Sequence, residues 1–489
     1  MSGAELIVAA LLVPCAAAAG IALAGRWPNL REGVTLAAAV ALFTCTLALL
    51  PTVLAGASPR LFVLEMLPGI ALDFRVEPLG MLFALVASGL WIVNSVYSIG
   101  YMRANDEPRQ TRYYACFALA LGATMGIAFA ANLLTLFLFY EMLTLVTWPL
   151  VTHHGDDEAR AGGRTYLGFL LGTSIALLLP AIIATWALAG TLDFVAGGIL
   201  GGLHLSAAAL GGLLVLYMFG IGKAALMPFH RWLPAAMVAP TPVSALLHAV
   251  AVVKAGVFAV VKVIVYVFGV ESLAQAGAAG WLALMAGFTI LAASLVALRA
   301  DNLKRRLAYS TVSQLSYVIL AAAILLPLSI AAAALHIAAH AVSKITLFFA
   351  AGAIYTAAHK TEVSQLDGIG RRMPWTMAAF TVGALSLIGI PPAAGFLSKW
   401  MMVQAAAGAG HWLALAVLVV STLLNAAYFL PIVHAAFFRP APAGAPPHGE
   451  APWPMVLALL ATAAATLALP FAAAVPLGLA RAVGGVGVP

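Results

Sequence analysis

Apolar residues fill most of the chain in long runs, and short polar stretches separate one run from the next. Each run is roughly 20 residues or longer, which is the length that a helix needs to cross about 30 Å of hydrocarbon. Backbone groups in lipid must bond within their own segment, and barrel strands would be shorter and alternate in polarity, so the pattern predicts helices. Fourteen transmembrane helices are predicted, near residues 5–25, 32–55, 78–102, 112–131, 132–152, 164–190, 207–229, 240–267, 278–299, 305–325, 328–358, 372–404, 411–437 and 452–476.

The composition excludes an ordinary soluble protein. Of the 489 residues, 64% are hydrophobic and 8% are charged, and the mean hydropathy is +1.05, whereas soluble domains are about 25% charged. The polar stretches are too short for a soluble domain, and the sequence contains no Walker A motif and no G-x-G-x-x-G that opens a helix. The predicted fold class is therefore an all-α polytopic membrane protein that binds no nucleotide or other cofactor.

The distribution of basic residues predicts the orientation in the membrane. Sixteen of the 24 Lys and Arg residues lie in connections after odd-numbered predicted helices, three lie in the other connections or the C-terminal tail, and five lie within the apolar runs. By the positive-inside rule, the odd-numbered connections are cytoplasmic and both termini face outward from a bacterial cell (inner) membrane. The net charge of +7 therefore reflects orientation and does not indicate a nucleic-acid partner.

Two of the apolar runs carry prolines next to a lysine. Lys223 is followed by Pro228, Pro234, Pro240 and Pro242, and Lys399 is preceded by Pro391 and Pro392. Proline removes a backbone donor and clashes with the preceding turn, so both helices are expected to open there. Open backbone inside a membrane is tolerated where it lines a cavity, and two such breaks in corresponding places indicate repeats around a transport site. Plain proline kinks are the alternative.

Charged residues also lie inside the apolar runs, where each costs about 3 kcal/mol or more. They are Glu141, Lys223, Lys254, Lys262, Lys344 and Lys399. Glu141 lies midway along its predicted helix and Lys223 lies at a similar place in another, so we expect the two to pair. Burial and pairing act on proton affinity in opposite directions, so making and breaking the pair would switch Lys223 between holding and releasing a proton. A static structural ion pair is the alternative.

The predicted helix over 240–267 carries three titratable groups with different expected roles. Lys254 is deep enough to relay protons, and His248 lies six residues before it on another face. Lys262 is near the end of the helix, so we expect its side chain to extend to the membrane interface.

A polar stripe is predicted on the helix over 328–358. His336, His340 and Lys344 follow one another at i+4 spacing, so they share a face and are expected to line a wetted path. Zinc would need further ligands, but no acid or thiol lies nearby and the three cysteines lack metal-type spacing, so no metal is expected. The remaining histidines do not extend this path, and those in loops are expected to carry solvated charge: His153, His154, His359 and His448.

Four segments between about residues 75 and 440 resemble a known family. They are FYEMLTL, GKAALMPFHRWLPAAMVAPTPVSALLHAVAVVKAGVF, DNLKRRLAYSTVSQLSY and HIAAHAVSKITLFFAAG. These motifs are similar to those of the antiporter-like subunits of respiratory complex I and of Mrp-type multisubunit cation/proton antiporters. The resemblance implies two inverted five-helix repeats, at helices 4–8 and 9–13, with discontinuous helices 7 and 12. The implied division is 1–110, 111–270, 271–440 and 441–489.

The resemblance also implies residue roles. Glu141, Lys223, Lys254 and Lys399 match the family's proton-transfer groups on helices 5, 7, 8 and 12. His248, His336 and His340 match positions of the connecting hydrophilic axis, and Lys344 is a companion of the last two.

The segment RRMPWTMAAFTVGALSLIGIPPAAGFLSKW is most similar to the D-type subunits of Mrp antiporters. This similarity implies a proton-translocating subunit of a Na⁺/H⁺ antiporter that works with other membrane subunits and is not itself an enzyme. A complex I subunit, and so a part of NADH:quinone oxidoreductase, or a subunit of a membrane-bound hydrogenase is the alternative. Only one acid lies deep in the membrane, so we expect this chain to carry H⁺ and a partner to handle Na⁺.

Overall fold

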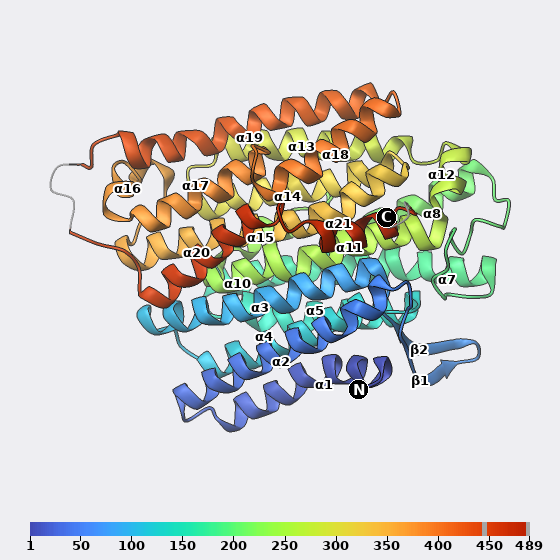
Figure 1. Cartoon of the computed structure of the whole chain (residues 1–489), viewed down its shortest axis with the longest axis horizontal. Helices are drawn as coiled ribbons and strands as arrows, with labels where there is room; N and C mark the ends of the chain where they lie inside the picture. The colour runs from blue at the N-terminus through green and yellow to red at the C-terminus, as the bar shows by residue number, and fades with distance from the viewer. Residues whose placement is uncertain (443–446, 486–489) are drawn as a thin grey trace.

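The computed structural model describes residues 1–442 and 447–485, which form helices running largely side by side (Figure 1). The first five helices are each continuous, and a two-stranded antiparallel sheet follows the second of them. Their bounds are α1 (Gly3–Leu23), α2 (Pro28–Leu54), β1 (Arg60–Leu67), β2 (Ile70–Arg75), α3 (Pro78–Ala104), α4 (Gln110–Ala128) and α5 (Leu133–Val151).

The next part of the chain is divided into shorter elements. Three of them, η1, η4 and η5, are π-helical and two, η2 and η3, are 3₁₀. The bounds are α6 (Asp157–Thr173), η1 (Ser174–Leu178), α7 (Leu179–Ala189), α8 (Ala207–Gly220), η2 (Gly222–Ala224), α9 (Trp232–Ala235), η3 (Ala236–Val238), α10 (Thr241–Ala245), η4 (Leu246–Val250), α11 (Val252–Val263), η5 (Ile264–Phe268) and α12 (Val270–Ala276).

The last part begins with three long helices and ends with two short ones. The bounds are α13 (Gly280–Arg299), α14 (Leu303–Ala323), α15 (Pro327–Ala358), η6 (Val363–Gln365), α16 (Ile369–Arg372), α17 (Pro374–Ile388), α18 (Ala394–Gly408), α19 (Trp412–Phe438), α20 (Trp453–Ala468) and α21 (Ala474–Val483). Each of the predicted apolar runs contains at least one helix, and within the described residues nine helices are long and apolar enough to cross a membrane. The all-α membrane class is confirmed, whereas the count of fourteen spans stays a prediction.

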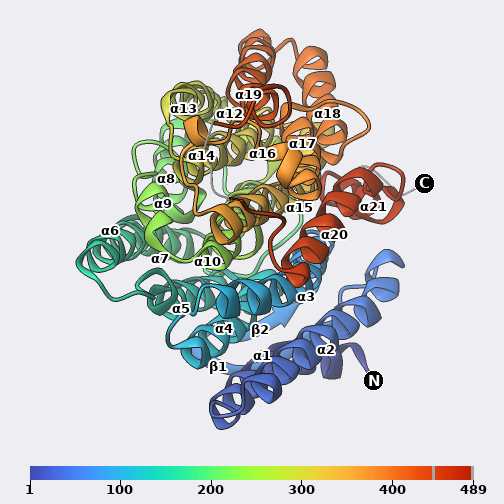
Figure 2. The same cartoon turned by 90° about the vertical axis from the view of Figure 1, so that its left-hand side faces the viewer.

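The bundle has a buried centre and an exposed edge. In its most apolar stretch α15 is 94% buried and the segment 241–268 is 89% buried, against 28% for α2. Viewed along the helices, α10 and α15 lie near the middle and α1 and α2 lie at one side (Figure 2). Alanines make up much of α15, and small side chains let neighbouring backbones approach closely in a membrane protein. The polar stripe predicted on α15 is therefore in the interior.

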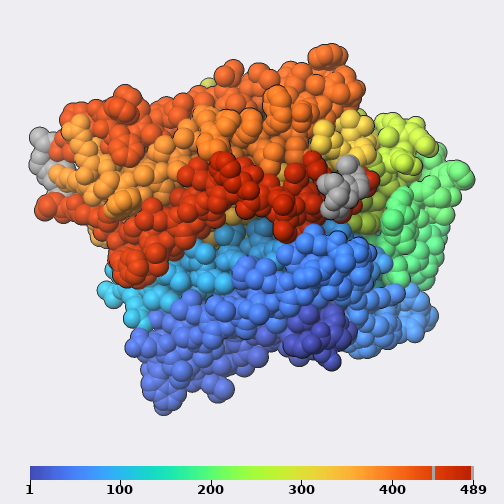
Figure 3. Space-filling model, viewed as in Figure 1, coloured from blue at the N-terminus to red at the C-terminus, as the bar shows by residue number. Residues whose placement is uncertain are grey.

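Two parts of the chain differ from the predicted pattern. The stretch between α2 and α3 forms the β1–β2 hairpin, which turns at Pro68 and Gly69 and projects beyond the helices (Figure 1). The single helix predicted over 452–476 is instead α20 and α21, separated near Pro470, because proline cannot continue the hydrogen-bonding ladder. These two helices lie across one face of the bundle between its early and late helices (Figure 3).

Candidate functional site

The first predicted break is present and holds Lys223. Helix α8 ends at Gly220, and Lys223 follows in the short turn η2, fully buried. Its Nζ donates hydrogen bonds to the carbonyl oxygen of Tyr140 at 2.7 Å and to Oγ1 of Thr144 at 2.6 Å, and it lies 3.3 Å from the centre of the Tyr140 ring. Because the helix is broken here, the ammonium group of Lys223 lies against α5.

The predicted contact between Glu141 and Lys223 is not formed. Among the described residues, no hydrogen-bond partner is found for either carboxylate oxygen of Glu141, and no ion pair joins it to Lys223 within 4.0 Å. Tyr140 and Thr144 are four residues apart and share a face of α5, whereas Glu141 points about 100° further round the helix. Lys223 still acts electrostatically on Glu141, and the Ser174 side chain also interacts with the Glu141 carboxylate.

The second predicted break separates α17 from α18, with Lys399 in the first turns of α18. Lys399 Nζ reaches back and donates to the carbonyl oxygens of Leu387 at 2.6 Å and Ile388 at 3.3 Å. The last carbonyls of a helix have no partner of their own and carry partial negative charge, so a lysine is stabilised there. The ring of Tyr317 lies 4.5 Å from the ammonium nitrogen. Lys399 thus closes the open end of α17.

Close backbone approach at both breaks depends on glycine. A Cβ on Gly256 of α11 would overlap with the carbonyl carbon of Lys223, and a Cβ on Gly395 of α18 would overlap with the carbonyl oxygen of Ser386. The hydroxyl of Ser386 in turn accepts a hydrogen bond from the backbone N–H of Gly395 at 2.9 Å. Each broken helix therefore packs against its neighbour at a position where any larger residue forces a shift.

The helix α15 brings the predicted stripe into contact with both halves of the chain. His340 Nδ1 and Lys254 Nζ of α11 are hydrogen-bonded. His336 Nδ1 lies 2.8 Å from Oγ of Ser398 on α18, and its Nε2 lies 3.1 Å from Oε1 of Gln314 on α14. Lys254, His336 and His340 are all buried.

These contacts join Lys254 to Lys399. The His340 and His336 rings stack with centroids 6.1 Å apart. Gln314, which faces His336, donates from Nε2 to the carbonyl oxygen of Leu387 at 3.4 Å, and the same carbonyl accepts from Lys399. The route has two gaps, one between the stacked histidine rings and one at the Leu387 carbonyl, which accepts from both Gln314 and Lys399 and carries no proton itself. Proton transfer along it therefore needs side-chain rearrangement or bridging water at these two places.

A second set of contacts surrounds Lys344 and His248. Lys344 Nζ donates to Oγ of Ser310 at 2.5 Å, and His248 Nδ1 lies 3.1 Å from Oγ1 of Thr311. Ser310 and Thr311 are consecutive residues of α14. His248 itself lies in the π-helical segment η4, and single π-helical turns inside helices occur frequently at functional sites.

Known proteins match most of this chain. The family described as "NADH:quinone oxidoreductase/Mrp antiporter, TM" matches residues 130–425, a range that includes every residue of the route above. The chain belongs to this family. It is 34% identical to NADH-quinone oxidoreductase subunit N of Desulforudis audaxviator, over 84% of this chain and 82% of that protein.

Other relatives are longer than this chain. It is 31% identical to the A/B component of a probable K⁺/H⁺ antiporter of Rhizobium meliloti over 92% of this chain, but spans only 45% of that protein. Among solved structures, it matches a chain of the Mrp complex from Dietzia sp. DQ12-45-1b with a TM-score of 0.85, covering 99% of this chain and 97% of that one at 23% identity. This likeness concerns the fold.

The predicted position of the Lys262 side chain is wrong. Lys262 does not extend to an interface but is fully buried, with Nζ 2.5 Å from Oε1 of Glu77 and 2.8 Å from the carbonyl oxygen of Ala130. The end of α11 lies inside the bundle, where it meets the start of α3 and the end of α4. Glu77, the residue before α3, was missed because it lies at the edge of an apolar run.

One of the loop histidines also differs from its prediction. His153 is fully buried, and its Nε2 lies 3.5 Å from Oε2 of Glu107, to which the more exposed His154 also bonds at 3.2 Å. Burial would raise the pKa of Glu107, but His153 and His154 outweigh it and lower that pKa to about 2. The hydrogen bond with Glu107 in turn raises the pKa of His154.

The partners of the predicted residues were largely not foreseen. They are the uncharged Tyr140, Thr144, Ser310, Thr311 and Gln314. Three of them lie in the segment YSTVSQLSY, which is unusually polar for a membrane helix, and that polarity is the signal that could have indicated them.

Proposed function

We propose that the chain is a proton-translocating subunit of a multisubunit Na⁺/H⁺ antiporter of the Mrp type, corresponding to the D-type member of such complexes. The observation that carries this proposal is the buried run from Lys254 through His340, His336 and Gln314 to the Leu387 carbonyl that Lys399 holds. Charged groups in a membrane protein are rarely kept without a task. Side chains with exchangeable protons, placed in a row between two broken helices, are better explained by proton transfer than by a role in packing.

In this proposal Lys223 and Lys254 are successive stations. The two lie on elements that touch through Gly256, because α11 packs against η2 there. Bridging water molecules would carry the proton where side chains do not meet. Glu141 acts on Lys223 through its charge without a direct bond, so proton gain or loss at Glu141 changes how firmly Lys223 holds its own proton.

From Lys254 the proton passes to His340 across their hydrogen bond. Histidine can accept on one ring nitrogen and release from the other, which suits His340 and His336 to hand the proton toward Ser398 and Gln314. Lys399 is the last station. His248 and Lys344 lie beside the route, and each is hydrogen-bonded to a hydroxyl group of α14. We propose them as relays into the route.

The proposal includes an orientation and a division of the chain. The basic connections would face the cytoplasm of a bacterial cell and both termini would face outward. Residues 111–270 and 271–440 would be the two inverted repeats, with 1–110 and 441–489 outside them. Other membrane subunits would be partners, since the Dietzia structure is of an Mrp complex. Alone, the chain would carry out no chemical conversion.

A second candidate is a subunit of a redox-driven complex. The match with NADH-quinone oxidoreductase subunit N extends over 82% of that protein, and another relative, 32% identical, is hydrogenase-4 component B of Escherichia coli. The same proton route would serve in either setting. Purification with native partners separates the candidates, because small antiporter subunits and quinone oxidoreductase subunits would be distinguished among the proteins recovered.

The route is tested by transport in everted membrane vesicles containing the whole complex. Lys223→Ala and Glu141→Ala should each reduce proton transport to background while the complex still assembles. Arg160→Ala is the control, because it also removes one positive charge but from a side chain that is 66% exposed. Transport by Lys223→Ala at the Arg160→Ala rate would contradict the proposed route.

A further inference from the structure

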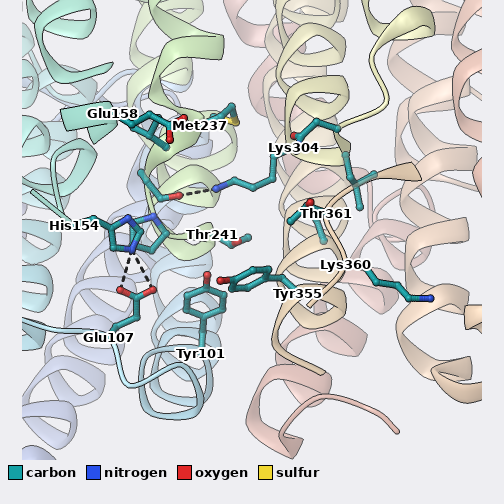
Figure 4. A pocket seen from close by; sticks show the side chains of 16 residues that line it. Tyr101, Glu107, His154, Glu158, Met237, Thr241, Lys304, Tyr355, Lys360 and Thr361 are labelled. Carbon is teal, nitrogen blue, oxygen red and sulfur yellow. Dashed lines mark hydrogen bonds and ion pairs between the residues drawn. The ribbon is translucent and has the colours of Figure 1, made fainter. Parts of the chain in front are cut away.

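A polar pocket lies at the end of the bundle where connections from both halves of the chain meet (Figure 4). Its volume is about 390 Å³, and residues that define it include Tyr101, Glu107, His154, Thr241, Lys304 and Tyr355. We call it the basic-end pocket, because its walls come from connections after odd-numbered predicted helices, which carry most of the basic residues. One water needs roughly 10–15 Å³ measured in this way, so the pocket has room for many.

The rim of the pocket is a carboxylate held between two imidazoles. His154 Nε2 lies 3.5 Å from Oε1 and 3.2 Å from Oε2 of Glu107, and Figure 4 shows both contacts. His153 approaches the same carboxylate from its buried side. Other titratable groups are coupled to the two rim residues: the Glu107 carboxylate acts electrostatically on Tyr101, Tyr113 and Lys304, and Asp156 acts on His154.

The inner wall of the pocket holds Lys304. Its Nζ donates a hydrogen bond to the carbonyl oxygen of Ala239 at 2.6 Å, across the pocket from its own helix. Lys304 interacts electrostatically with both Glu107 at the rim and His248 in the interior. The sequence pattern indicated it only as one of the cytoplasmic positive charges.

Two helical segments that line the pocket continue inward, one to His248 and the other to Thr311. Thr241 begins α10 and lies seven positions before His248, and Lys304 lies seven positions before Thr311 on α14. Seven residues of helix rise about 10 Å, and the two segments meet where His248 Nδ1 contacts Oγ1 of Thr311. Within the part of the chain that the structure describes, Nε2 of His248 is buried and has no hydrogen-bond partner. A buried nitrogen of this kind calls for a partner that arrives from elsewhere.

We infer that the basic-end pocket is the site of proton uptake from water, with Glu107, His153 and His154 as the collecting group and Lys304 as the residue that hands protons on to His248. The inference rests on the proposed function. A hydronium ion gives its proton to neutral His154 and becomes water. The imidazolium returns that proton to a water in the pocket and is neutral again. Lys304 releases a proton toward Nε2 of His248 and takes one from the pocket, so one proton moves inward and each group is restored.

The competing explanation is a structural staple that holds the α3–α4 connection against the α5–α6 connection. A staple would affect the amount of assembled complex and its thermal stability. It would not change how transport depends on the pH at the basic end, and this difference makes the two explanations separable.

The first experiment measures proton uptake by vesicles of the intact complex while the pH on the basic-end side is varied. Lys304→Met should lower the rate at least about tenfold at all pH values, and Lys304→Arg should keep assembly while failing to restore transfer, because arginine does not release its proton. Arg305→Met is the matched control, since Arg305 is the exposed neighbour on the same helix and is not part of the pocket lining. His154→Asn should slow uptake severalfold at high pH, where protons are scarce, and little at low pH.

The second experiment tests water access without using transport. Met237→Cys, in a chain whose native Cys15, Cys45 and Cys116 are replaced by serine, should react with a membrane-impermeant thiol reagent only from the basic-end side, because Met237 lines the pocket. Absence of labelling would overturn the inference. If both Lys304→Met and His154→Asn took up protons at the wild-type rate, the uptake site would be contradicted, while the proposed function would be unaffected. A wild-type complex that moves no protons would overturn both.

Discussion

Two combinations of an acid and a lysine inside the bundle are arranged in opposite ways. Lys262 is paired, with a carboxylate oxygen of Glu77 at 2.5 Å and the carbonyl of Ala130 at 2.8 Å. Lys223 bonds only to uncharged oxygens of α5, and within the described residues no ion pair joins it to the nearby Glu141 carboxylate. The first pair joins α11 to the start of α3, whereas the second lies at a broken helix.

The difference separates a structural ion pair from a site suited to transfer. A buried pair whose opposite charges are in direct contact is held in one state, because removing either charge leaves the other uncompensated. A lysine that lies near an acid without bonding to it can gain or lose a proton with smaller rearrangement. Under the proposed function, the Glu77–Lys262 pair stabilises the fold, whereas Glu141 and Lys223 take part in transport.

The largest expected effect is on transport by Lys223→Met. Removing a proton-transfer group should lower the rate by about 100-fold or more, because no other group in η2 can hold the proton. Thermal stability of the purified complex should change little, since no buried carboxylate loses a direct partner. Parallel measurement of vesicle transport and melting temperature checks this, and a large loss of stability with intact transport would reverse the assignment.

Lys262→Met should show the opposite pattern. It leaves Glu77 buried and unpaired, which costs about 3–5 kcal/mol, so less complex should assemble and its melting temperature should fall. Transport per assembled complex should remain near that of the wild type. The double variant Glu77→Leu with Lys262→Met should recover stability, and failure to recover would mean that the pair does more than hold α3 against α11.

Gly256→Ala should have an intermediate effect centred on Lys223. The added methyl group overlaps with the backbone of Lys223, and overpacking of this kind costs roughly 1–3 kcal/mol, while displacement of the ammonium slows transfer. Gly212→Ala on α8 is the control, because nothing lies within 4 Å of its added methyl group. Equal transport rates in the two variants would show that proton transfer does not depend on the exact position of Lys223.

The smallest expected effect comes from Glu107→Gln, which alters an acid–base contact near the surface. The lowered pKa of Glu107, about 2 against an ordinary 4.5, contributes stability above pH 4.5 that is lost as the pH falls toward 2. The raised pKa of His154, against an ordinary 6.5, contributes stability that is complete below pH 6.5 and is lost as the pH rises through the raised value.

The two contributions overlap between about pH 4.5 and 6.5. The melting temperature of Glu107→Gln should therefore fall furthest below that of the wild type near pH 5.5, and the gap should narrow toward pH 8. Because the His154 side chain is 37% exposed, the difference should stay under about 1 kcal/mol. A gap that does not depend on pH would show that charge is not involved.

Sequence patterns predicted the breaks better than the partners. Prolines next to Lys223 and Lys399 act locally, so both openings could be read from their neighbours along the chain. Lys254 and His340 are 86 positions apart, and their contact depends on how α11 meets α15. The β1–β2 hairpin was not predicted, because the pattern of long apolar runs indicates that stretch only as a connection between helices.

The sequence alone shows a helical membrane protein with charged groups deep inside it, because apolar runs of this length can cross hydrocarbon only as helices and each charge within them is costly. Its motifs also indicated the family to which it belongs. Only the tertiary structure decided which lysine is paired and which is open. That choice depends on the rotation and depth of each helix relative to its neighbours, as Lys262 facing Glu77 and Lys223 turned away from Glu141 demonstrate.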